Sequence, residues 1–149
     1  ASAKKTMTAI HTTWPTLEVV ELPELVRFLD PNDKGPDGRG KPVIDVMMPL
    51  ASFQQTILKE FVVVDPKTGH RLPMLEGALV AKYAPMVSLT RSREKKEFDA
   101  GDFRRIARTN KDTINRDRLH RLAEEVFLGT GDEILQFLEL SYTDEAFPI

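Results

Sequence analysis

The sequence predicts an α+β protein: a small N-terminal mixed or antiparallel β-sheet followed by a C-terminal cluster of helices. Two observations indicate this class. Up to about residue 75 the chain consists of short runs rich in β-branched residues, separated by Pro and Gly. From residue 76 onward apolar residues recur every three or four positions, which is typical of helices with one buried face. Because 149 residues suit one domain, we expect a single domain over 1–149.

The first half of the chain is expected to hold three strands. "TLEVVEL" (16–22) and "ELVRFLD" (24–30) are short apolar runs bounded by prolines, and the second also fits one turn of helix. "VIDVMMP" (43–49) predicts a third strand, with alternate residues on its two faces. Three Pro and three Gly make 30–42 an exposed loop, and we expect 1–13 to be a flexible N-terminal arm.

The segment after the third strand predicts a helix and a hairpin. Residues 50–61, "LASFQQTILKEF", carry the apolar stripe of a helix that lies on a sheet. Residues 61–75 hold a β-branched run and a second short strand, joined by a turn that contains Pro66 and Gly69.

The remaining chain predicts four helices. The first starts at 76, and Pro85 should kink it or end it within a turn or two. The second covers 94–109 and aligns three apolar residues on one side: Phe98, Phe103 and Ile106. The third has Asn115 as its N-cap and Gly129 as its stop, and the fourth begins at Asp132.

The composition excludes several classes of site. The chain has 41% hydrophobic and 30% charged residues, a formal net charge of −2 and no cysteine. Disulfides, thiolate zinc sites and cysteine nucleophiles are therefore excluded. No stretch approaches the length of a membrane span, so we expect no membrane association and a cytoplasmic, intracellular location.

The charge is unevenly distributed. Residues 91–121 contain eleven Lys or Arg and six Asp or Glu, so this predicted helical face is basic. Such a face can dock an acidic protein partner or the acidic part of a second copy, which would make a homo-oligomer. Nucleic acid is the least favoured partner, because acids are interspersed and few aromatic residues are present for stacking.

Four polar residues stand out in apolar surroundings or at regular spacing. Asp45 lies in the middle of an apolar strand, where a buried carboxylate needs a cation, hydrogen-bond donors or a metal, unless that face is solvated. Lys82 interrupts the apolar helix "LEGALVAKYAPMV". Asp99 and Asp102, three residues apart, project from one helix face and are placed to orient Lys82 or Arg91. The same acids also fit a salt-bridged surface with no ligand.

These residues carry a resemblance to a known family. The run "LPMLEGALVAKYAPMVSLTRSREKKEFDAGDF" resembles the central helical segment of the minimal nucleotidyltransferase-like proteins, which include abortive-infection and toxin-type members. The matching features are Lys82 in "LVAKYA", Arg91 or Arg93, and the aspartate pair of "FDAGDF". The strand "VIDVMMP" is similar to the one that carries the family's third metal-binding carboxylate. The resemblance covers 43–110.

The resemblance implies roles for these positions. Asp45 and Lys82 would be catalytic, with Asp45 also a metal ligand, and the implied cofactors are Mg²⁺ and a nucleotide. The remaining implied ligand-binding residues are Asp99, Asp102, Arg91 and Arg93. The family's Gly-Ser followed by paired acids on the first strand is absent. A single carboxylate cannot hold two Mg²⁺ ions, so we expect a catalytically weak or inactive member, and whether the chain is an enzyme stays open.

Overall fold

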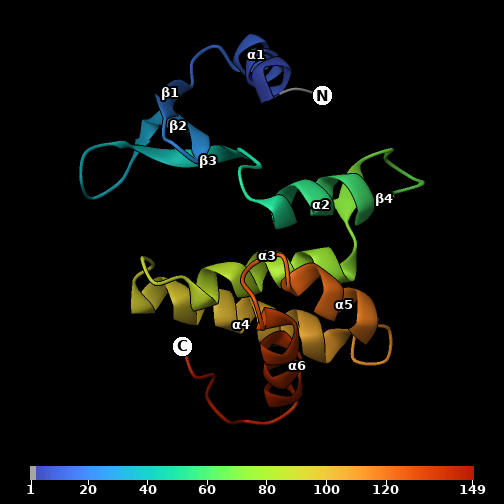
Figure 1. The fold of residues 1–149 in the computed structure, drawn as a ribbon. Helices are drawn as coiled ribbons and strands as arrows, with labels where there is room; N and C mark the ends of the chain where they lie inside the picture. The colour runs from blue at the N-terminus through green and yellow to red at the C-terminus, as the bar shows by residue number, and fades with distance from the viewer. Residues whose placement is uncertain (1–2) are drawn as a thin grey trace. The chain divides into compact units, whose positions relative to one another are not determined.

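The computed structural model describes residues 3–149. The chain forms two compact units, which we name the sheet unit (Ala1–Leu50) and the helical unit (Ala51–Ile149). The single domain that the length predicts stays a prediction. The order of elements, with a small antiparallel sheet first and helices after it, confirms the α+β class (Figure 1).

The sheet unit contains one helix and a three-stranded antiparallel sheet. The helix α1 (Ala3–Thr13) precedes β1 (Glu18–Glu21), β2 (Leu25–Lys34) and β3 (Gly40–Met47), and the strands lie in the order β1-β2-β3. The expected flexible arm is thus a helix from residue 3 onward, and residues 1–2 lie outside the described chain. None of the α1 residues is buried.

The register of the sheet sets the surroundings of Asp45. Arg27 on β2 lies opposite Asp45 on β3, and Phe28 lies opposite Ile44. Phe28 is fully buried, whereas the β3 residues facing away from it are exposed. The expected alternation along 43–47 is therefore confirmed, and Asp45 lies on the solvated face.

The expected loop over 30–42 is shorter than the sequence suggests. β2 continues to Lys34 and β3 begins at Gly40, with a register shift between Asp30 and Lys34. Pro31 sits in this irregularity, where its missing N–H leaves no ladder hydrogen bond unmade. Gly40 is required at its position, because an added Cβ would lie 2.6 Å from the backbone oxygen of Asp30.

The helical unit begins with a helix and the expected hairpin. The helix α2 (Ser52–Glu60) is followed by β4 (Val62–Val64) and β5 (Arg71–Pro73), which pair antiparallel. The turn between them closes through a hydrogen bond of 2.9 Å from the Asp65 N–H to the His70 carbonyl.

Four further helices complete the helical unit: α3 (Leu75–Val87), α4 (Arg93–Thr109), α5 (Arg116–Ala123) and α6 (Thr130–Ser141). Helix α3 packs against α4 and α5, and α6 packs against α5 and α4 (Figure 1). Their core is apolar and fully enclosed, with large side chains such as Leu79, Tyr83, Phe103, Leu122 and Phe137. In the described chain, none of the helices is long and apolar enough to cross a membrane.

The helix boundaries follow the sequence signals except between α5 and α6. The α3 helix ends two residues after Pro85, and the Asn115 side chain caps α5 by accepting a 3.0 Å hydrogen bond from the Arg118 N–H. However, α5 ends at Ala123 rather than at Gly129. Gly129 instead has a left-handed φ of 87° and is the N-cap of α6, which therefore starts before Asp132.

Candidate functional site

Lys82 on α3 lies between the two aspartates of α4. Its Nζ is 2.7 Å from Asp102 Oδ2 and 3.5 Å from Asp99 Oδ1. This arrangement follows from helix geometry, because residues three apart share a helix face and α4 packs directly on α3. The structure thus brings together three of the side chains that the sequence selects.

Arg91 joins the same group from the connection between α3 and α4. Its Nη2 is 2.5 Å from Asp99 Oδ2, so one carboxylate pairs with both cations. The contact is close but poorly aligned for a hydrogen bond, and the Nε of Arg91 is buried with no acceptor in the described chain. The guanidinium therefore uses only part of its donor set. We name Lys82, Arg91, Asp99 and Asp102 the charged cluster.

Burial differs among the members of the charged cluster. The Asp99 side chain is 7% exposed, whereas Lys82 and Arg91 are 34% and 36% exposed. A buried carboxylate is stable only if cations or donors face it, and here two cations do. The buried acid thereby fixes the two bases, whose remaining surface is open to solvent.

Asp102 lies nearer to solvent than Asp99. The hydrogen bond from Lys82 lowers the pKa of Asp102 below its ordinary value, and the nearby charges of Lys82 and Arg105 add to this effect. Arg105 Nη2 is 3.2 Å from Asp102 Oδ1. Arg105 is not among the residues that the sequence selects, although its position three residues after Asp102 on a helix is a signal that could have identified it.

Phe98 corrects a prediction. The sequence places it on the buried stripe with Phe103 and Ile106, yet its side chain is exposed while Phe103 is fully buried. Phe98 and Phe103 are five positions apart, which puts them on different faces of a helix. The Lys82 Nζ lies 6.0 Å from the centroid of the Phe98 ring. An exposed aromatic ring therefore borders the charged cluster.

Arg93 is not part of the charged cluster. Its Nε donates a 3.0 Å hydrogen bond to Glu97, one turn along α4, and its side chain is 81% exposed. Of the two arginines that the resemblance offers, Arg91 is the one that contacts the aspartate pair.

Asp45 belongs to the sheet unit, and its charge is balanced there. Both of its oxygens accept 2.8 Å hydrogen bonds from Arg27 on the neighbouring strand. This pairing lowers the pKa of Asp45 and raises that of Arg27. Asp45 therefore lies on a solvated face and also has a cation as its cross-strand neighbour, two possibilities that the sequence left open.

The arrangement of acids does not fit a protein-bound Mg²⁺. That ion needs several oxygen ligands in octahedral geometry. Both oxygens of Asp45 are taken by Arg27, and those of Asp99 and Asp102 face three cations: Lys82, Arg91 and Arg105. Over residues 3–149, no group of three or more His, Asp or Glu side chains is placed to hold a metal ion.

Most arginines of the basic segment 91–121 have partners within the helical unit. Arg116 pairs with Glu139 at 2.6 Å, and Arg108 donates to the backbone oxygens of Ser141 and Thr143, each at 2.6 Å. Arg104 donates to the backbone oxygen of Glu145. Two of these bases, Arg104 and Arg108, thus attach the end of α6 and the residues after it to α4.

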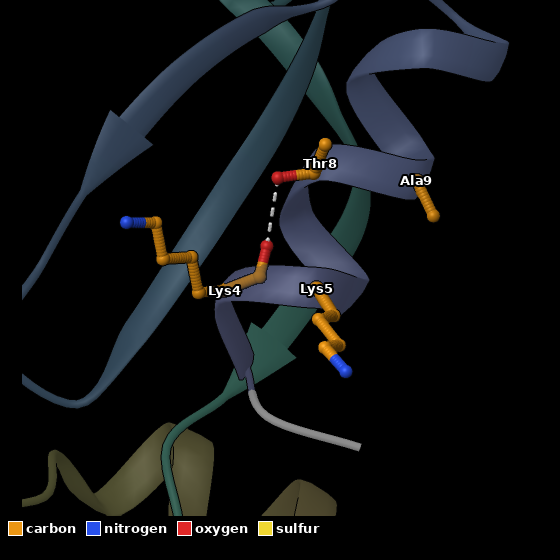
Figure 2. Close-up of a pocket in the computed structure, with 4 residues that line it drawn as sticks. All are labelled: Lys4, Lys5, Thr8 and Ala9. Carbon is orange, nitrogen blue, oxygen red and sulfur yellow. Dashed lines mark hydrogen bonds between the residues drawn. The ribbon is translucent and has the colours of Figure 1, made fainter.

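Two surface hollows lie on the sheet unit, and neither is lined by a residue that the sequence selects. Figure 2 shows the first, along α1, lined by Lys4, Lys5, Thr8 and Ala9. The Thr8 hydroxyl donates to the Lys4 carbonyl at 3.0 Å, and the two lysine side chains point in different directions (Figure 2). This hollow lacks the convergent polar groups of a binding site.

The charged cluster is therefore the strongest candidate for a functional site in the described chain. It combines a buried acid, two oriented cations and an exposed aromatic ring. Comparison of the chain with known proteins does not identify a family: no family model, curated protein or solved structure matches it.

Proposed function

We propose that the helical unit is a nucleotidyltransferase-like unit that binds the phosphates of a nucleotide through Lys82 and Arg91, and that it is weak or inactive as a catalyst. The single observation that carries the proposal is the buried carboxylate of Asp99, which pairs with both cations. A site that must hold an anion benefits from bases that are already oriented, because less side-chain freedom is lost on binding.

The charges of the cluster favour an anionic ligand. With Arg105, three cations face two carboxylates, which leaves a net positive charge. Lys82 and Arg91 are each about one third exposed, so their free donors can reach phosphate oxygens.

Weak or absent catalysis is proposed because the acids are already paired with cations. Nucleotidyl transfer depends on metal ions that carboxylates hold against the phosphates. We also place the protein inside the cell, since a sequence without cysteine suits a reducing compartment. A nucleotide is the partner that this proposal names.

Isothermal titration of the full chain with ATP and with inorganic tripolyphosphate tests the proposal. Both ligands should bind, and Lys82→Met should weaken both by about tenfold or more, as expected for losing a charge-assisted hydrogen bond. Lys82→Arg, which keeps the charge, should retain part of the affinity.

The matched control is Lys59→Met, since Lys59 is an exposed lysine in the last turn of α2. This variant should bind as the unmodified protein does. Absence of heat at millimolar ligand, or an equal loss for the two Lys→Met variants, would refute phosphate binding at the charged cluster.

A further inference from the structure

We infer that Phe98 is a stacking platform for the base of the nucleotide, so that a purine nucleotide binds more tightly than phosphate alone. The inference rests on the proposed function and names the part of the ligand that the charged cluster cannot recognise. Its basis is the position of an exposed aromatic ring beside the two oriented cations.

Phe98 lies on the exposed side of α4. Its side chain is 71% exposed, although α4 has a buried face that Phe103 and Ala107 occupy. Exposing a large ring costs free energy that burial would recover. A single exposed apolar residue needs no explanation by itself, but this one directly precedes Asp99 and borders Lys82.

The distance between cation and ring suits one nucleotide. The Lys82 Nζ lies 6.0 Å from the ring centroid, at the outer limit of a cation–π contact, so that contact is weak. A ligand whose phosphates meet Lys82 and Arg91 would carry its base within reach of the ring. Every base has a flat π face, and stacking on an aromatic side chain tolerates different bases.

The ring also gives a reason to prefer purines. A purine has two fused rings and covers more of a phenyl face than a pyrimidine does, so its stacking buries more apolar surface. Asp99 and Asp102 are already paired with cations, which leaves them poorly placed to read base edges. Selectivity among purines is therefore expected to be weak.

Titrations of the full chain with ATP, CTP and tripolyphosphate separate the base from the phosphates. ATP should bind more tightly than CTP, and CTP more tightly than tripolyphosphate. Phe98→Leu should weaken ATP binding by about tenfold and leave tripolyphosphate binding unchanged, while Phe98→Tyr should preserve ATP affinity. Because the side chain is exposed, these variants should keep the thermal midpoint of the unmodified protein.

Phe127→Leu is the matched control, since Phe127 is an exposed phenylalanine on the turn between α5 and α6. It should change none of the three affinities. The inference is overturned if tripolyphosphate binds as tightly as ATP, or if Phe98→Leu weakens both ligands equally. Phosphate binding would stand in those cases, whereas failure of all three ligands to bind would overturn the proposed function as well.

Discussion

The hydroxyl of Tyr83 on α3 donates a 2.6 Å hydrogen bond to Glu133 on α6, inside the helical unit. The Tyr83 side chain is fully buried and its ring packs edge-on against Phe137 at 5.5 Å between centroids. Burial, followed by the hydrogen bond to Glu133, raises the pKa of Tyr83, so the phenol stays protonated and remains a donor. This pair links the helix that carries Lys82 to α6.

Replacing Tyr83 by Phe should lower the free energy of unfolding by roughly 1–2 kcal/mol. The ring and its packing remain, but Glu133 loses its donor from α3. Chemical denaturation followed by far-UV circular dichroism measures the change. Tyr142→Phe is the control, because Tyr142 is only half-buried and its hydroxyl has no hydrogen bond within residues 3–149. Equal losses for both variants would argue against the Tyr83–Glu133 bond as the cause.

The charged cluster predicts an order of stability among its acids. Asp99→Asn should cost roughly 1–3 kcal/mol, because Arg91 and Lys82 would both lose their buried partner. Asp102→Asn should cost less than about 1 kcal/mol, since Asp102 is 22% exposed and Lys82 keeps Asp99. Urea unfolding at neutral pH gives both values. If the Asp102 variant were the less stable one, Asp99 would not be the acid that organises the cluster.

Sequence patterns were sufficient for most of the helical unit. The i, i+3 spacing of Asp99 and Asp102 places both on one face of α4, and this face meets Lys82 on the neighbouring helix α3. The N-cap at Asn115 and the end of α3 after Pro85 follow from local chemistry in the same way.

The sequence prediction was incomplete or wrong at Asp45, Phe98 and Gly129, for a different reason at each residue. Asp45 could not be assigned a partner, because a strand register depends on which residues face each other across the sheet. The predicted stripe places Phe98 on the buried face with Phe103, although residues five positions apart lie on different faces of a helix. Gly129 fits either the stop of one helix or the start of the next, and it lies at the start of α6 because α5 already ends at Ala123.

Glu124 gives the stability of the helical unit a dependence on pH. Its carboxylate accepts hydrogen bonds from the backbone N–H of Gly129 at 3.0 Å and of Gly131 at 2.9 Å, at the start of α6. These bonds lower the pKa of Glu124 in the folded protein below its ordinary 4.5. The ionised form therefore favours folding above about pH 4.5, and this contribution is lost as the pH falls through the lower folded value.

Glu124→Gln should flatten the fall in thermal midpoint below pH 4.5 and lower the midpoint at neutral pH. The amide keeps one acceptor oxygen and has no charge to titrate. Glu94→Gln, at an exposed residue of α4, should leave the pH profile unchanged in shape. An unchanged profile for the Glu124 variant would show that another carboxylate carries the dependence.

Replacing either of two glycines of the helical unit by alanine should change the free energy of unfolding, in opposite directions at the two positions. Gly101 lies inside α4, and a Cβ added there meets nothing within 4 Å. Gly101→Ala should therefore raise the free energy of unfolding by about 1 kcal/mol, because alanine loses less backbone entropy in a helix. Gly129 has a φ of 87°, so Gly129→Ala should cost about 1–2 kcal/mol. Urea unfolding of both variants checks the pair, and a gain at Gly129 would contradict the left-handed N-cap of α6.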